Sequence, residues 1–309
     1  MDITIDRKQY QSIIVYGIGQ YYEVIKTELF RRVKPDFLCD RKWDTHTPGS
    51  YDGIPIIKRD ILPQMGKILV IICIGSAWIN SSVKNDLEQM PGIEVIFVDD
   101  LLGKNKNITG KQLKELDSDG YYEDNWGNRI YYDATVSDNV SIVFYGKNNI
   151  LRIGRNVIVG ELTIGFGSKG TCVIGDYTEV IGGYFAVSGA KLVIGKDCLT
   201  STQILIRNHD GHHIFDLETH KRINYPRDII IEDHVWIGYK TIILGGARIG
   251  GGSVIGAGTV TSGQFGRNKV IAGCPARVLR ENICWSKDNT DYYNYDFLEE
   301  TESCSTTLF

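Results

Sequence analysis

The second half of the sequence repeats every six residues. From position 231 an isoleucine recurs at 237, 243, 249 and 255, and the residue four places later is always small or β-branched. A period of six fits neither an α-helix nor a flat sheet, whose periods are about 3.6 and 2. It is typical of a β-solenoid, whose aliphatic residues fill the interior while small residues pack near the corners. We therefore predict a parallel β-solenoid, with looser upstream repeats at Ile153, Ile164, Ile174 and Ile194.

The glycine content agrees with this fold. The 309 residues include 34 glycines but only seven prolines, and no Gly-X-Y period is present, which excludes collagen. Most of the glycines follow Tyr145, one or two per repeat. Glycine suits the tight corners that a solenoid turns in every coil.

Charge and hydropathy exclude several classes of function. The net charge is −4 and no long Lys/Arg run occurs, so nucleic-acid binding is not expected. The longest apolar run, 68–74, has the length of a buried strand and not of a membrane span. The first residues lack the basic and apolar regions of a secretory signal, and the seven cysteines are scattered without a Cys-x-x-Cys pair. We expect a cytoplasmic protein without structural zinc or a disulfide framework.

Residues 1–116 are predicted to form a Rossmann-like α/β domain. Short apolar runs alternate with segments of helical spacing, which indicates a parallel sheet. Gly17-x-Gly19 follows the first run and allows the backbone to approach a phosphate at a helix N-terminus. Asp40 stands where such folds place a group that binds a ribose or base, but Tyr22 replaces the third glycine of the NAD fingerprint. Gly17, Gly19 and Asp40 form either a nucleotide or nucleotide-sugar site or a glycine turn without a ligand.

Over roughly 131–280 the hexapeptides resemble those of the left-handed β-helix acyltransferases. The resemblance implies a left-handed coil, acetyl-CoA as acyl donor, and a homotrimer with active sites between subunits. The segment from Gly273 to Val278 resembles the one that closes the solenoid near CoA in that family. We place a linker or cap at 117–130, the solenoid at 131–284 and an acidic tail at 285–309, which is either disordered or a cap on the last coil.

An insert at 207–228 interrupts the repeat and contains four of the six histidines. Such an insert in a solenoid is expected to be a functional loop. Its motif, together with Trp236, resembles the bacterial sialic-acid and capsular-polysaccharide O-acetyltransferases. The residues that carry this resemblance are Asp210, His212, Ile214, Asp216, Arg222, Ile223 and Asn224, followed by the run Val235-Trp236-Ile237-Gly238.

Acetyl transfer to a hydroxyl needs a base that removes the proton as oxygen attacks the thioester. Histidine suits this role because its ordinary pKa of about 6.5 leaves much of it neutral. The resemblance assigns the base to His212, with Asp210 or Asp216 orienting the imidazole. It also carries over Trp236, which would shape the pocket beside a backbone N–H that stabilises the oxyanion. The acetyl group would pass directly to the acceptor, so no cysteine nucleophile is needed.

Further candidates concern the cofactor, the acceptor and a metal. Small residues on the solenoid surface leave room for the pantetheine arm, and cations near the end of the solenoid suit the CoA phosphates. Any one of the glycines, taken alone, is better explained as a corner of the coil. No metal is expected, because the His-x-x-x-x-His spacing of the zinc-dependent carbonic anhydrases of this fold is missing. The cofactor candidates are Gly238, Gly256, Ala257, Thr259, Lys269 and Arg277, and Arg222 and Asn224 are candidate substrate-binding residues.

Three functions remain from the sequence. The first is an acetyl-CoA-dependent O-acetyltransferase that modifies a sugar hydroxyl in bacterial capsular or lipopolysaccharide synthesis. The alternative is an N-acetyltransferase of a nucleotide-linked amino sugar, bound by the N-terminal domain. A non-enzymatic trimeric scaffold is the third. The acceptor is accordingly a sugar, a nucleotide sugar or a polysaccharide.

Overall fold

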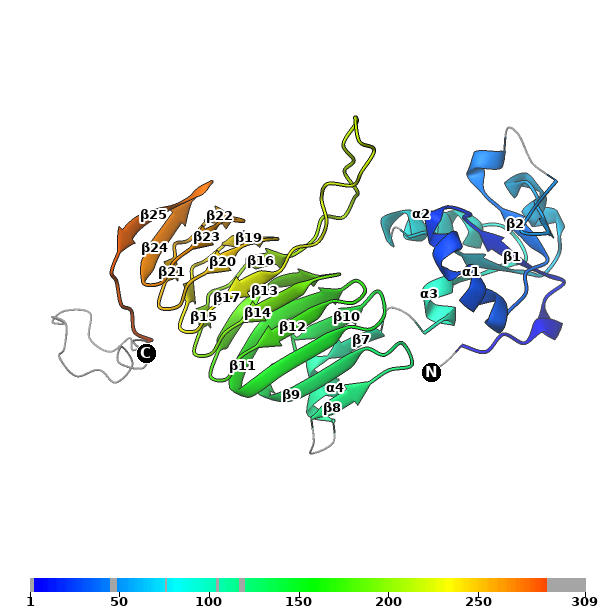
Figure 1. Ribbon diagram of the computed structural model, residues 1–309. Coiled ribbons are helices and arrows are strands. Elements are labelled where there is room, and N and C mark those ends of the chain that lie inside the picture. Colours follow the sequence, from blue (N-terminus) through cyan, green and yellow to red (C-terminus); the bar gives the residue numbers. More distant parts are fainter. Residues whose placement is uncertain (1–2, 45–48, 76, 104–105, 117–119, 288–309) are drawn as a thin grey trace. The chain divides into compact units, whose positions relative to one another are not determined.

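The N-terminal part of the chain is a parallel sheet with helices, as the sequence predicts. The computed structural model describes residues 3–44, 49–75, 77–103, 106–116 and 120–287, and the chain divides into two units, Met1–Asn105 and Lys106–Phe309 (Figure 1). The first unit contains β1 Ser12–Tyr16, β2 Phe37–Cys39, β3 Ser50–Tyr51, β4 Ile54–Pro55, β5 Ile68–Ile72 and β6 Ile93–Phe97, helices α1 Gln20–Arg32, α2 Ala77–Glu88 and α3 Val98–Leu101, and short 3₁₀ turns at Arg7–Gln9, Arg41–Trp43 and Arg59–Gln64.

The order of the parallel strands determines where this unit can bind a ligand. The sheet runs β2-β1-β5-β6, and all five residues of β5 are buried, as expected for a parallel strand covered on both faces. β2 pairs with one edge of β1, and the chain then crosses over so that β5 pairs with the other edge of β1. Open α/β sheets bind ligands at such a reversal, outside the carboxyl ends of the strands.

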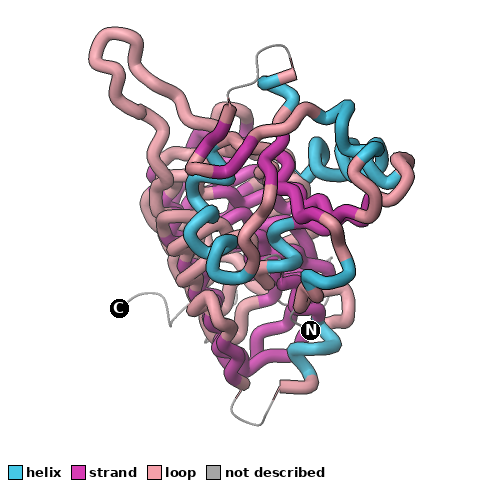
Figure 2. The backbone as a smooth tube through the Cα atoms, turned by 90° about the vertical axis from the view of Figure 1, so that its right-hand side faces the viewer, coloured by secondary structure: helices cyan, strands magenta, loops and turns pink. Residues whose placement is uncertain are grey.

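The second unit winds into a three-sided solenoid. Between its two ends, strands of one coil pair in parallel with strands of the next coil. Trp236 opposite Val254 and Ile242 opposite Val260 show a repeat of eighteen residues. Three hexapeptides therefore make one coil, and stacked coils form three sheet faces (Figures 1 and 2). Its strands are β7 Lys106–Thr109, β8 Tyr121–Glu123, β9 Arg129–Val136, β10 Ser141–Phe144, β11 Ile150–Phe166, β12 Thr171–Ile174, β13 Glu179–Val187, β14 Lys191–Ile194, β15 Leu199–Thr200, β16 Ile204–Arg207, β17 Ile229–Ile231, β18 Trp236–Ile237, β19 Ile242–Leu244, β20 Arg248–Ile249, β21 Val254–Ile255, β22 Val260–Thr261, β23 Gln264–Phe265, β24 Lys269–Gly273 and β25 Ala276–Glu281, with helix α4 Gly110–Lys114.

The interior of the solenoid confirms the six-residue pattern. All five isoleucines of the strict repeat are fully buried, and so are the small or β-branched residues four places later. Thr241 and Thr259 show how a polar residue is accommodated there, because each hydroxyl donates to a glycine carbonyl at its corner. The core is thus continuous from coil to coil, and no single coil could bury its aliphatic residues alone.

One corner of the coil repeats a left-handed backbone conformation. The equivalent positions of successive coils have a φ between 53° and 68°, and they are Asn156, Tyr177, Asp197, His234, Gly252 and Asn268. Asparagine, aspartate and histidine tolerate this conformation better than most residues. Side chains at this corner are therefore stacked directly above one another.

Both ends of the solenoid are covered. β7 pairs antiparallel with β10 of the first coil, and β25 folds back antiparallel on β24 of the last one. Since β7 belongs to the solenoid sheet, the boundary between the units lies after residue 105, earlier than the expected 116. The expected cap at 117–130 contributes β8 and the start of β9, while 117–119 and the tail from 288 lie outside the described residues. Among the described residues, no helix is long and apolar enough to span a membrane.

Candidate active site

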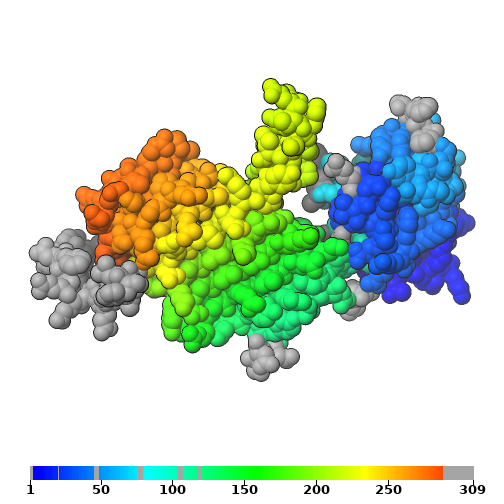
Figure 3. Space-filling model, viewed as in Figure 1, coloured from blue at the N-terminus to red at the C-terminus, as the bar shows by residue number. Residues whose placement is uncertain are grey.

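The insert that breaks the repeat forms an arm, defined here as residues 209–225, which projects from the solenoid between β16 and β17 (Figures 1 and 3). Its base is tied to the coils through Asn208, which is buried and whose backbone N–H donates to the carbonyl of Ala186. The N–H of Arg227 donates to the carbonyl of Asn208, and this hydrogen bond joins the two ends of the arm at its base. Further out, Phe215 and Arg222 pair as an antiparallel bridge. The arm is therefore an ordered hairpin with a fixed root.

Asn224 holds the two sides of the arm together beside His212. Its amide nitrogen donates to the Asp210 carboxylate at 2.9 Å and to the His212 carbonyl at 2.7 Å. Its amide oxygen accepts from the N–H of Ile214 at 2.8 Å and from Arg222 Nε at 3.3 Å. The arrangement fixes the backbone on both sides of His212. The side chain of Asn224, which was expected to bind substrate, forms its hydrogen bonds within the arm.

The two aspartates expected to orient His212 have other partners. Asp216 accepts from the backbone N–H of Thr219 at 2.7 Å, from its hydroxyl at 2.8 Å and from the N–H of Glu218, and these bonds, led by those of Thr219, lower the pKa of Asp216. Asp216 thus caps the turn at the tip of the arm, and Asp210 bonds Asn224. Within the described ranges, neither carboxylate is bonded to the His212 imidazole, which is exposed.

Trp236 lies on β18, one strand after the arm returns. Its side chain faces outward and is 41% exposed, and its ring centroid is 6.0 Å from that of Trp285. The backbone N–H groups of Trp236 and Gly238 both donate to the next coil, so neither is the free oxyanion donor expected here. In the part of the chain that the structure describes, no hydrogen bond or ring contact joins Trp236 to His212.

The small residues proposed for the cofactor divide into surface and interior. Gly238 and Gly256 stand in adjacent coils, and a Cβ on Gly238 would lie 2.7 Å from the backbone nitrogen of Ala257, so close coil stacking requires this glycine. Ala257 is exposed, whereas Thr259 is fully buried and its hydroxyl donates to the carbonyl of Gly256. The Thr259 side chain therefore cannot contact a ligand on the surface.

The two candidate cations differ in availability. Lys269 is paired with the carboxylate of Glu281 across the last hairpin. Arg277 is exposed on β25, and its guanidinium donates only to the carbonyl of Ala276, at 3.1 Å, among the described residues. Arg277 is accordingly the better placed of the two for a CoA phosphate.

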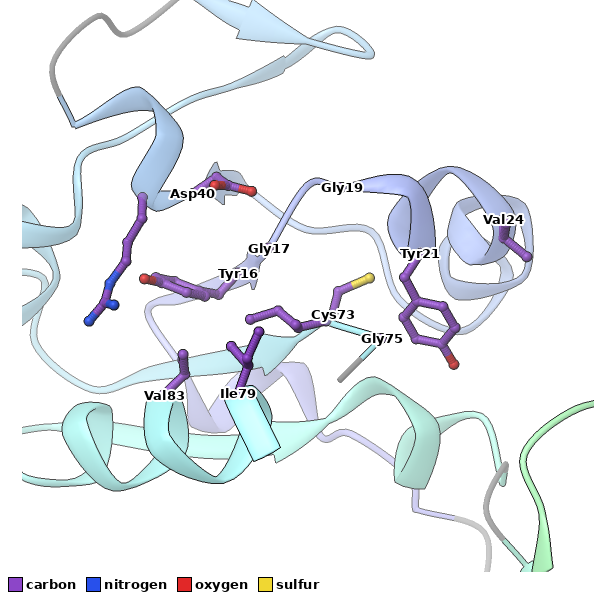
Figure 4. A pocket seen from close by; sticks show the side chains of 12 residues that line it. Tyr16, Gly17, Gly19, Tyr21, Val24, Asp40, Cys73, Gly75, Ile79 and Val83 are labelled. Atoms are coloured by element: carbon purple, nitrogen blue, oxygen red, sulfur yellow. The ribbon is translucent and has the colours of Figure 1, made fainter. Parts of the chain in front are cut away.

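A separate pocket of about 670 Å³ lies at the strand reversal of the first unit (Figure 4). Gly17, with φ of +96°, allows close packing here, since a Cβ would lie 2.9 Å from the Cys73 carbonyl oxygen. Gly19 leads into α1 with open space around it and no side-chain cap. Asp40 accepts from the N–H of Ile18 at 2.6 Å and from that of Lys42 at 3.0 Å, which ties the loops after β1 and β2 together.

Sequence reasoning missed two residues of this pocket. Tyr16 lines it, and its hydroxyl is buried without a hydrogen-bond partner among the described residues; burial raises the pKa of Tyr16. Arg41 lines the same pocket, and its guanidinium is also paired with the Asp86 carboxylate at 3.4 Å. Tyr16 and Arg41 could have been found from their place in the sequence, since each stands at the carboxyl end of a predicted parallel strand.

Two further features concern metal ligands and cysteine thiols among the described residues. No group of three or more His, Cys, Asp or Glu side chains there is arranged to hold a metal ion. Burial raises the pKa of Cys172 to about 12 and that of Cys198 to about 11, so both thiols stay protonated.

Comparison with known proteins finds acetyltransferases among the relatives of this chain. No family model matches the chain. It is 33% identical to the polysialic acid O-acetyltransferase of Neisseria meningitidis over 201 residues, which are 57% of this chain and 94% of that protein. It is 30% identical to the polysialic acid O-acetyltransferase of Escherichia coli O1:K1 over 158 residues and spans about half of that relative's length. A solved structure of the polySia-specific acetyltransferase NeuO is 28% identical, over 54% of this chain and 88% of that one, with a TM-score of 0.45.

The fold and these relatives define an acyl-transferring enzyme built on a hexapeptide solenoid. The chain belongs to the hexapeptide-repeat acetyltransferases, the family that includes the polysialic acid O-acetyltransferases.

Proposed function

We propose that this enzyme is an acetyl-CoA-dependent O-acetyltransferase that esterifies a sugar hydroxyl of a bacterial surface polysaccharide, on a left-handed solenoid. The observation that carries the proposal is the arm, in which Asn224 fixes the backbone around His212 and leaves its imidazole exposed. The polysialic acid O-acetyltransferases named above and a putative lipopolysaccharide O-acetyltransferase of Escherichia coli K12 support a glycan acceptor.

In the proposed reaction, His212 removes the proton from the acceptor hydroxyl while the hydroxyl oxygen attacks the thioester carbon. The carbonyl oxygen becomes an oxyanion. Trp236 would stabilise it through its indole N–H, which has no partner among the described residues, because its backbone N–H is used in the sheet. Collapse of this intermediate breaks the C–S bond, and the His212 imidazolium returns its proton to the departing CoA thiolate. The products are the sugar ester and free CoA, and Arg277 would bind a CoA phosphate.

The exposed surface of the arm supports a site shared between subunits. Five large apolar side chains project from it into solvent, far more than a short hairpin keeps exposed in a monomer. We propose that a second copy in a homotrimer covers them and that its Trp236 completes the site around His212. The five residues are Ile214, Phe215, Leu217, Ile223 and Tyr225.

A mixing experiment tests this arrangement. His212→Ala and Trp236→Ala subunits, each inactive alone, are unfolded, mixed in equal amounts and refolded together. If one site uses His212 of one subunit and Trp236 of the next, every mixed trimer regains one intact site of three, and roughly a quarter of wild-type activity returns. Recovery that stays at the level of the single variants would place both residues in one subunit and contradict the shared site.

A second candidate function rests on the pocket of the first unit. Gly17, Gly19 and α1 suit a phosphate (Figure 4). Arg41 adds a cation that is also paired with Asp86, and the Tyr16 hydroxyl, which has no partner among the described residues, would accept a polar ligand group. We propose on these grounds that a nucleotide-linked amino sugar is the competing acceptor, with N-acetylation as the reaction.

Calorimetry with UDP- and GDP-sugars checks the pocket. The N-acetyltransferase interpretation requires binding that weakens about tenfold or more in two variants. Tyr16→Phe loses a polar contact to the ligand, and Asp40→Asn loses one of the acceptors that tie the two loops of the pocket together. Gly49→Ala, which has open space at its Cβ, serves as the matched control and should bind as the wild type does. The absence of measurable binding by the wild-type enzyme would remove this function.

A further inference from the structure

The corner beside Trp236 carries a cluster that the proposed reaction does not use. Asp197 and His234 occupy the same left-handed corner position in adjacent coils, so their side chains meet, with His234 Nδ1 2.6 Å from Asp197 Oδ2. The other ring nitrogen, Nε2, lies 2.9 Å from the backbone carbonyl oxygen of Trp285. A carboxylate and a carbonyl can only accept, so both bonds form when each ring nitrogen carries a proton.

The bonds between His234 and Trp285 are reciprocal. The Trp285 indole N–H donates to the His234 carbonyl at 2.9 Å, and the two rings stack with centroids 4.2 Å apart and planes inclined by 13°. Lys287 adds ion pairs to Asp197 at 3.0 Å and to Glu179 at 3.4 Å. Residues 285–287, here named the strap, are thus fastened to the corner by hydrogen bonds, stacking and charge.

The strap also reaches Trp236. Trp285 is 8% exposed, and its ring is tilted against the Trp236 ring, with centroids 6.0 Å apart and planes inclined by 39°. Trp236 stands on a strand of two residues, and its backbone position is fixed by its N–H bond to Ser253. The ring itself has no other aromatic contact among the described residues, so Trp285 restricts its rotation.

We propose that Trp285 is a positioning residue for acetyl transfer: fixed on His234, it holds the Trp236 ring in the orientation that the active site uses. The inference rests on the proposed function, since it concerns the site to which Trp236 is assigned. A small displacement of a site residue can cost up to about a hundredfold in rate, which gives such a contact a measurable effect.

The experiment combines kinetics with a direct observation of the Trp236 ring. The full chain is labelled with 5-fluorotryptophan, and the Trp236 ¹⁹F resonance is assigned by its loss in Trp236→Phe. In Trp285→Ala we expect this resonance to move and narrow, and kcat/KM for the acceptor to fall about tenfold or more through kcat. Trp285→Phe keeps a ring on His234 and should recover most of both. His234→Asn tolerates the left-handed corner but loses both ring bonds, and should reproduce Trp285→Ala.

A destabilised variant away from the strap serves as the control. Gly146→Ala perturbs coil stacking elsewhere in the solenoid, because its Cβ would lie 2.3 Å from the Gly167 carbonyl oxygen. Its rate per folded enzyme should stay normal, with an unchanged Trp236 resonance. A Trp236 resonance that is unaffected by Trp285→Ala overturns the inference, whatever the activity. A shifted resonance with normal kcat/KM overturns it too, because the ring is then held without consequence for transfer. If Trp236→Ala itself transfers acetyl normally, the proposed site fails, while the resonance still reports whether Trp285 holds the ring.

Discussion

Replacing His212 with alanine is expected to lower kcat for acetyl transfer by about 10²–10⁴-fold, which is the usual contribution of a positioned general base. The protein should fold normally, because the His212 side chain is exposed and the arm is held by Asn224 through the His212 backbone carbonyl. KM for acetyl-CoA should change little. The measurement is initial-rate kinetics of CoA release with a saturating glycan acceptor, together with the thermal unfolding midpoint.

His213→Ala is the matched control for this variant. His213 is the next residue of the arm, it is also exposed, and its ring contacts Phe215 at 6.1 Å between centroids. Its loss should leave kcat within about twofold of the wild type, as for a surface substitution. Equal losses in the two variants would mean that the arm acts through its shape, and normal turnover by His212→Ala would eliminate His212 as the base.

A large effect on stability is expected from a methyl group at Gly175. Its added Cβ would lie 2.6 Å from the carbonyl carbon of Gly195 and 2.8 Å from the backbone nitrogen of Lys196, so one coil would be pushed from the next. Overpacking of this kind costs about 1–3 kcal/mol. For a unit of this size, Gly175→Ala should lower the unfolding midpoint by roughly 2–12 °C in scanning calorimetry.

Gly211→Ala provides the comparison within the same unit. Gly211 lies in the arm, its φ is outside the left-handed region, and a Cβ would meet nothing within 4 Å. Its substitution should change stability by less than about 0.5 kcal/mol. Equal midpoints for the two variants would show that the corner glycines are not required for coil stacking.

The solenoid was predictable because its signal is local and repeated. Each hexapeptide buries one isoleucine and one small residue by the same rule, so five units in register predicted both the fold and the buried positions. The arm was predictable for the complementary reason, as the longest break in that rule. The parallel sheet of the first unit followed from alternating apolar and helical segments.

The polar contacts of the site could not be predicted in the same way. Asp216, one of the two alternatives for orienting His212, caps a turn, because the motif spacing does not reveal which backbone N–H groups surround a carboxylate. Thr259 was expected on the surface, yet the corner geometry turns its hydroxyl inward. Trp285 was placed in an acidic tail, and its contact with His234 spans 51 residues, which no local pattern contains.

The most direct test of the central claim is mass spectrometry of acceptors incubated with the enzyme and ¹³C-labelled acetyl-CoA. The panel contains capsule oligosaccharides, free sugars and nucleotide-linked amino sugars, and each reaction is repeated with His212→Ala. Our account predicts a labelled acetyl group on an oligosaccharide, absent with His212→Ala and released by hydroxylamine, which cleaves esters and leaves amides intact. A labelled product that resists hydroxylamine, or one formed equally by His212→Ala, would contradict it.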